Sequence, residues 1–83
     1  MKDEYLQYFS DEIKKGTNIS EVLRALIFMD KSLSSHELSE LVEEAFPSTN
    51  SELLQAIWHW EGKKEGGITD NKLDLMGKHY IQI

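Results

Sequence analysis

Three features of the sequence predict a mainly α-helical fold, a compact domain of about four helices with a small C-terminal β-hairpin. A residue that can cap a helix stands three positions before a glutamate in the segments 18–21, 34–37 and 49–52. Apolar residues follow each of these signals at the i, i+3, i+4, i+7 spacing of one helix face. A glycine-rich segment, 62–67, then interrupts the helical pattern before two short apolar runs.

The three cap signals set the expected helix starts. In a capping box, the cap side chain accepts a hydrogen bond from an unpaired N–H of the first turn, and the glutamate accepts one from the N–H of the cap residue. Asn18, Ser34 and Thr49 stand 16 and 15 residues apart, which leaves room for helices of about 11 residues and tight turns. We therefore expect a tri-helical core over residues 18–62, with helices near 19–30, 35–46 and 50–61.

One more helix is expected before this core, over residues 3–15. Leu6, Phe9 and Ile13 share a face, while acidic residues occupy the first turn and lysines the last, as the helix dipole favours. Gly16 is the expected stop of this helix, because glycine readily adopts the left-handed conformation that ends helices.

Residues 68–83 are expected to form the hairpin. The runs 73–76 and 79–83 flank Gly77-Lys78, and glycine at the first central position permits a type II′ turn. A short helix from Asp70 to Met76, with Gly77 at its cap, is the alternative, because short apolar runs do not distinguish helix from strand by periodicity.

Length and composition indicate a single domain over residues 1–83. The chain has no cysteine, and no apolar run approaches the roughly 18 residues needed to cross a bilayer. We therefore expect a cytoplasmic protein that makes no membrane contact. So small a core is only marginally stable, and a homodimer is one way to support it.

The net charge of −6 is unevenly distributed. Residues 31–62 contain one lysine and six glutamates, whereas residues 63–83 contain four lysines and three acidic residues. Glu37, Glu40 and Glu44 fall at i, i+3 and i+7, on the expected outer face of the helix near 35–46. This acidic face favours a basic protein surface as its partner.

Aromatic residues near this face are candidate anchors of an interface. Trp58 shares the core face of its helix with Leu54, whereas Trp60 points about 200° away if the helix continues. Either both tryptophans pack in the small core, or Trp60 is partly exposed and anchors an interface. Phe28 and Met29 lie off the main apolar stripe of their helix, and would either extend the patch or pack against the helix expected over residues 3–15. Tryptophan is enriched among the residues that dominate binding energy in interfaces.

The order helix, helix, turn, helix, glycine, hairpin resembles the winged helix-turn-helix superfamily over residues 19–83. The segment 33–42 is similar to the first motif helix, 48–57 to the second, and 66–83 stands in place of the wing. The resemblance implies a winged-helix-like fold and a DNA-binding transcription regulator. Its DNA-binding residues would be Asn50, Ser51, Gln55, His59, Lys63, Lys64, Lys72 and Lys78.

Charge decides between these two hypotheses. DNA binding depends strongly on neutralising phosphates, and the acidic helix near 35–46 would repel them. Nucleic-acid binding is therefore the alternative. Our leading hypothesis is a small acidic protein-interaction module, such as an inhibitor, an adaptor or a nucleic-acid mimic.

Catalytic and cofactor signatures are missing from the sequence. It has no nucleophile elbow and no glycine-rich loop leading into a helix as phosphate sites require. His36, His59 and His79 do not follow a known metal-ligand spacing. We therefore expect no enzymatic activity, no metal and no cofactor.

Overall fold

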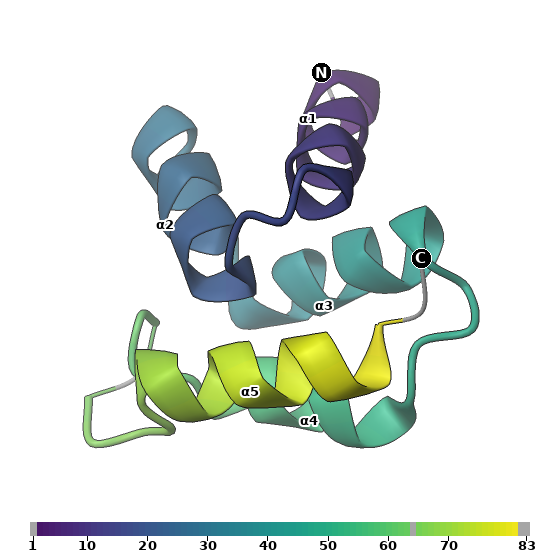
Figure 1. The fold of residues 1–83 in the computed structure, drawn as a ribbon. Helices are drawn as coiled ribbons and strands as arrows, with labels where there is room; N and C mark the ends of the chain where they lie inside the picture. The colour runs from purple at the N-terminus through teal and green to yellow at the C-terminus, as the bar shows by residue number, and fades with distance from the viewer. Residues whose placement is uncertain (1, 64, 82–83) are drawn as a thin grey trace.

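The computed structural model describes residues 2–63 and 65–81, which contain five helices (Figure 1). They are α1 (Lys2–Lys14), α2 (Ile19–Met29), α3 (Ser35–Ala45), α4 (Ser51–Trp58) and α5 (Asp70–Tyr80). The expected helices near 3–15, 19–30 and 35–46 are confirmed to within one residue at each end. The fourth ends at Trp58, three residues before its expected end.

The predicted C-terminal hairpin is wrong. Residues 70–80 form helix α5, and the part of the chain that the structure describes has no strand, although Trp60 and Ile68 form an isolated parallel bridge. Gly77, which the sequence analysis assigned to a turn, lies buried inside α5. A Cβ atom there would stand 2.8 Å from Cγ2 of Ile19 on α2. Gly77 thus permits two helices to approach closely, rather than a chain reversal.

The capping box at Ser34 is confirmed. Its Oγ accepts from the backbone N–H of Glu37, and the Glu37 carboxylate accepts from the N–H of Ser34, both at 3.1 Å. The cap of α4 lies one residue later than expected: Asn50, not Thr49, accepts from the N–H of Glu52. Thr49 is buried, and its hydroxyl donates to the Phe46 carbonyl at 2.6 Å.

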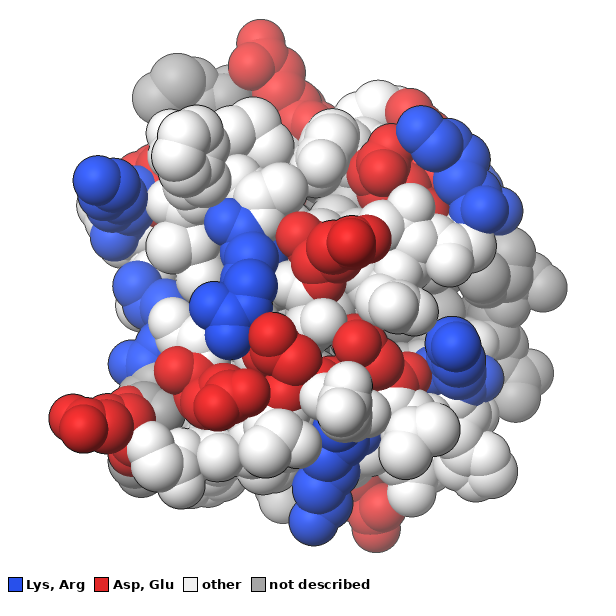
Figure 2. Space-filling view, turned by 60° about the vertical axis from the view of Figure 1, so that its left-hand side comes forward, with Lys and Arg blue, Asp and Glu red and all other residues white. Residues whose placement is uncertain are grey.

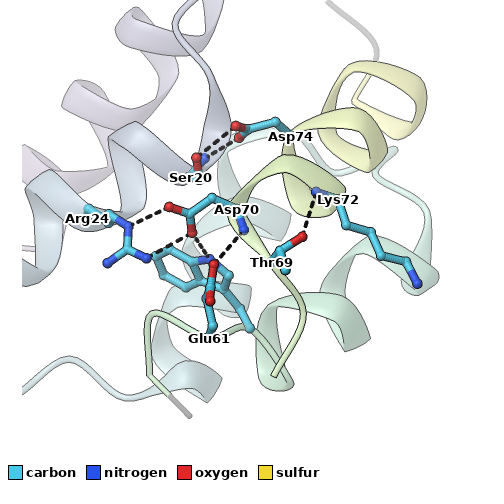
Figure 3. A network of polar contacts seen from close by, with 8 residues as sticks. Ser20, Arg24, Glu61, Thr69, Asp70, Lys72 and Asp74 are labelled. Atoms are coloured by element: carbon cyan, nitrogen blue, oxygen red, sulfur yellow. Dashed lines mark hydrogen bonds and ion pairs between the residues drawn. The ribbon is translucent and has the colours of Figure 1, made fainter. Parts of the chain in front are cut away.

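Asn18 makes no side-chain cap bond, so the capping box predicted at residues 18–21 does not form. The N–H of Ser20, in the first turn of α2, donates instead to Asp74 of α5 at 2.8 Å, and the Ser20 hydroxyl donates to the other carboxylate oxygen at 2.9 Å (Figure 3). A carboxylate 54 positions away in the sequence therefore caps this helix.

Gly16 ends α1 as predicted. It has a φ of +98°, its N–H donates to Ile13, and the N–H of Thr17 donates back to Glu12. These two bonds form a Schellman motif, which turns the chain toward α2.

The principal contacts between helices form a closed ring. α1 packs against α2 and α3, α2 against α5, α5 against α4, and α4 against α3. The core lies inside this ring, and its largest fully buried side chains are Trp60, Phe9, Leu23, Leu26, Leu38, Leu53, Ile57 and Leu73. Helices α2, α3 and α4 therefore rely on contacts with α1 and α5 to complete their packing. Within the described residues, none of the helices combines the length and apolar character that crossing a membrane requires.

Candidate protein-interaction surface

The exposed side of α3 is acidic. At about 100° per residue, its exposed ionisable side chains occupy an arc of about 120°; in order around the helix they are Glu43, His36, Glu40, Glu44 and Glu37. The helix has no lysine or arginine. The structure therefore places the three predicted glutamates on one solvent-facing surface, together with Glu43. We refer to these four glutamates as the α3 acidic face.

Glu37 and Glu40 illustrate the local bonds that members of this face make. Glu37 completes the capping box with Ser34, and so contributes to the start of α3. The Glu40 carboxylate lies 2.6 Å from Nε2 of His36, an ion pair when the imidazole is protonated. Both side chains of this pair remain largely in solvent, with exposed fractions of 67% for His36 and 48% for Glu40.

A groove of 260 Å³ runs between α3 and α4, at one edge of the α3 acidic face. Carboxylates, an imidazole, small polar groups and an aromatic ring line it. The lining residues are His36, Ser39, Glu40 and Glu43 from α3, and Ser51, Leu54, Gln55 and Trp58 from α4.

Trp58 is the large aromatic residue of this groove. Its side chain is 46% exposed, whereas the sequence analysis assigned it to the core. The indole N–H donates to Oγ of Ser39 at 2.6 Å, and the Ser39 hydroxyl donates to the carbonyl of His36 at 2.8 Å. The ring centroid of His36 lies 5.8 Å from that of Trp58. The indole ring is therefore held in place by its bonded N–H, and part of its aromatic surface is exposed to solvent.

Trp60 does not have the exposure expected of an interface anchor, because it is fully buried. The expectation assumed that the helix continues to residue 61, but α4 ends at Trp58 and the chain turns Trp60 into the core. Its N–H donates to Asp70 at 2.8 Å, and the guanidinium of Arg24 lies 5.2 Å from its ring centroid. Gly62 packs so close to the ring that a Cβ atom there would overlap it.

Phe28 and Met29 are exposed, by 84% and 50%, and do not pack into the core. They lie at the end of α2, and none of the residues that line the α3–α4 groove belongs to that helix. Phe28 borders a different hollow, together with Arg24, Ile27, Lys31 and Gly62. The structure thus leaves these two apolar residues outside the groove.

The residues assigned to DNA binding are dispersed. Asn50 caps α4, Ser51 and Gln55 line the groove beside Glu40 and Glu43, and His59 is exposed at the end of α4. Among the lysines of that assignment, Lys63 is exposed in the turn after α4, Lys72 and Lys78 are exposed on α5, and Lys64 lies outside the described residues. Helix α5 occupies the place of the expected wing.

The most extensive polar network ties α2 to α5 (Figure 3). Nε and Nη2 of Arg24 donate to the two oxygens of the Asp70 carboxylate, both at 2.9 Å, and Trp60 adds a third bond to that group. The backbone N–H of Asp70 donates to Glu61 at 2.9 Å. Hydrogen bonding from Arg24 lowers the pKa of Asp70 below its ordinary value, although partial burial acts in the opposite direction.

This network has a structural role. Among the described residues, no buried side-chain nitrogen or oxygen lacks a hydrogen-bond partner, so the network leaves no buried polar group for a ligand. The face around it is also mixed in charge: in Figure 2, a band of acidic side chains crosses the lower half, with basic side chains on both sides. Neighbouring charges of opposite sign largely offset each other, and salt screens the remaining field beyond about 8 Å at physiological ionic strength.

Other hollows and clusters are weaker candidates for a site. A hollow of 220 Å³ between the end of α1, the start of α2 and α5 has mainly apolar walls, and Asp74 at its edge is already bonded to Ser20. Within the residues that the structure describes, no three histidine, aspartate or glutamate side chains converge as metal ligands would.

Among the residues of the groove that sequence reasoning missed are Glu43 and Trp58. Glu43 directly precedes Glu44 and points to another side of the helix. That other side is the one that faces α4. The spacing from Glu40 to Glu43 is i, i+3, which could have placed both on neighbouring positions of the surface.

In comparisons with known proteins, no family model, no curated protein and no solved structure matches this chain.

Proposed function

We propose that this protein is an interaction module that binds a basic protein surface through the α3 acidic face and the adjoining groove. The observation that carries the proposal is the composition of these two helices. Helix α3 presents four glutamates beside the half-exposed Trp58 of α4, and neither helix has a lysine or an arginine. Complementary charge accelerates association and excludes partners of the wrong sign.

The acidic arrangement is unfavourable for the stability of α3 itself. Glu43 and Glu44 occupy its last turn, where the helix dipole disfavours negative charge by about 0.3–1 kcal/mol per group. Glu40 also stands four positions before Glu44, a like-charge pair that destabilises a helix by a few tenths of a kcal/mol. A partner with positive charge offsets both costs, which supports a binding role for this face.

The same charges argue against DNA as the partner. Ser51 and Gln55, the groove residues that could contact bases, lie beside Glu40 and Glu43, and phosphates approaching them would be repelled. Helix α4 itself offers no cation to neutralise a phosphate.

Charge reversal tests the proposal. Glu40→Lys with Glu43→Lys changes the groove edge and leaves the capping residue Glu37 in place. Partners captured from host extract by the wild type should be identified by mass spectrometry, purified, and measured by surface plasmon resonance. We expect a basic partner whose association rate falls as salt rises, and at least about tenfold weaker binding by the double variant.

Glu4→Lys with Glu65→Lys is the matched control, because it changes the net charge equally at exposed sites on α1 and in the turn after α4. This control should bind like the wild type. Equal loss of partner binding in both double variants would show that binding depends only on net charge, and would contradict a specific role for the α3 acidic face. Specific binding of the wild type to one DNA duplex in gel shifts, lost in Gln55→Ala, would overturn the proposal.

A further inference from the structure

We infer that the groove between α3 and α4 is a binding site for an arginine side chain, with the guanidinium on the exposed surface of Trp58 and paired with Glu43 and Glu40. This inference rests on the proposed function and names the chemical group that the acidic surface recognises. The groove, its aromatic residue and its two carboxylates come together in one place.

Trp58 favours a cation over a hydrogen-bonding ligand. Its N–H is already bonded to Ser39 at 2.6 Å, so the exposed part of the ring consists of aromatic carbon. The face of an indole is negative and attracts a cation within about 6 Å of the ring centroid. His36, 5.8 Å from Trp58 between ring centroids, adds a second aromatic wall when neutral.

The carboxylates set the sign of the ligand. Glu40 and Glu43 are the two carboxylates of the lining, and both are exposed. Glu40 is partly engaged by His36 at 2.6 Å, so Glu43 is the principal partner that we assign to the incoming cation. Charge complementarity therefore selects a positively charged group for this groove.

The shape and hydration of the cation favour arginine over lysine. A guanidinium is planar, stacks on aromatic faces, is weakly hydrated, and can donate two parallel bonds to one carboxylate. A lysine ammonium is compact and strongly hydrated, so it loses more on leaving water for a groove with apolar walls at Leu54 and Trp58. A groove of 260 Å³ has room for one such side chain.

The direct test is an NMR titration of the intact protein with three capped tripeptides, which carry a central arginine, lysine or citrulline. Citrulline keeps the shape of arginine and lacks its charge. We expect the indole N–H signal of Trp58 to shift saturably with the arginine peptide, with a dissociation constant on the order of millimolar. Binding should be roughly threefold or more weaker with lysine, and absent with citrulline.

The chain supplies its own controls. The indole N–H of Trp60 is buried and bonded to Asp70, so its signal should stay in place throughout. Glu43→Gln should weaken arginine binding about two- to fivefold, whereas Glu65→Gln, outside the groove, should leave it unchanged. Trp58→Leu, followed through the backbone amides of Glu43 and Gln55, should abolish the saturable shift while the spectrum remains dispersed.

Several results would overturn the arginine site: no saturable shift at Trp58, equal shifts with citrulline or lysine, or Trp58 and Trp60 signals that move together. The peptide titration and the partner experiment can fail separately. A silent groove alongside a captured basic partner refutes only the arginine site. A saturable arginine response without a macromolecular partner refutes only the proposed function.

Discussion

At the scale of single residues, local signals were reliable at Ser34 and Gly16, whereas at Thr49 the cap lies one residue later, at Asn50. Ser34 and Glu37 form the predicted capping box, and Gly16 ends α1, because both motifs are completed within a few residues. Asn18 has the same sequence signal, but the N–H of Ser20 bonds to Asp74 on α5 instead. No property of the segment 18–21 could have indicated that a distant carboxylate would take this position.

This difference between Ser34 and Asn18 predicts unequal effects of the same mutation. Ser34→Ala removes the acceptor for the N–H of Glu37 and should lower the free energy of unfolding by about 1 kcal/mol. Asn18→Ala removes no cap bond and should change it by less than about 0.5 kcal/mol. Urea denaturation followed by circular dichroism measures both, and equal losses would show that the local signals act alike.

At the scale of elements, periodicity predicted four helices because each has a long amphipathic stripe. It failed after residue 58 for two separate reasons. The helical wheel for Trp58 and Trp60 assumed one continuous helix, and the early end of α4 exchanged their expected exposures. The apolar runs 73–76 and 79–83 are each too short to distinguish helix from strand by periodicity, and Gly77 looked like a turn residue although its missing side chain serves the contact with Ile19.

For Gly77→Ala, the contact between α2 and α5 predicts a loss of stability, whereas helix propensity alone predicts a gain. Alanine is a better helix former than glycine by about 1 kcal/mol, so an isolated α5 would gain stability. In the folded protein the new Cβ would stand 2.8 Å from Cγ2 of Ile19, and such overpacking costs about 1–3 kcal/mol. We expect a net loss of stability in urea denaturation.

A double-mutant cycle isolates the cause of this loss. Ile19→Ala alone should be destabilising, because it leaves a cavity in the core, but it should cost less in the Gly77→Ala background, where it relieves the overlap. If Gly77→Ala stabilises the protein, α5 does not depend on this close approach.

At the scale of the whole molecule, α5 closes the ring of helices because it packs against both α2 and α4. Three observations join it to the rest: the Asp74 cap on α2, the Arg24–Asp70 pair, and the Tyr80 hydroxyl, which donates to Glu52 on α4 at 2.7 Å. The sequence predicted three of the four glutamates of the α3 acidic face, because charge and helical spacing are local properties. It did not predict the groove, which exists only because the ring packs α4 against α3 with Trp58 turned outward.

The tie between α2 and α5 makes the stability of the molecule depend on pH. The pKa of Asp70 is lowered in the folded state, chiefly by its hydrogen bonds from Arg24, whereas the unfolded value lies near 3.9. Above roughly pH 5, Asp70 is ionised in both states and the pair contributes its full stabilisation. This stabilisation is lost as the pH falls through the lowered pKa of the folded protein, where Asp70 takes up a proton.

Arg24→Gln should therefore be less stable than the wild type at pH 7 by up to about 1 kcal/mol, a modest value because both side chains are partly exposed. The difference should shrink steadily below about pH 4, because the wild type then loses what the variant lacks. Glu12 and Asp30 also have lowered pKa values, but they titrate alike in both proteins and cancel in the difference. Urea denaturation from pH 2 to 7 measures it, with Lys14→Gln as a control that removes an exposed positive charge on α1. A difference that stays constant down to pH 2 would show that Arg24 stabilises the ring by packing on Trp60 rather than by its charge.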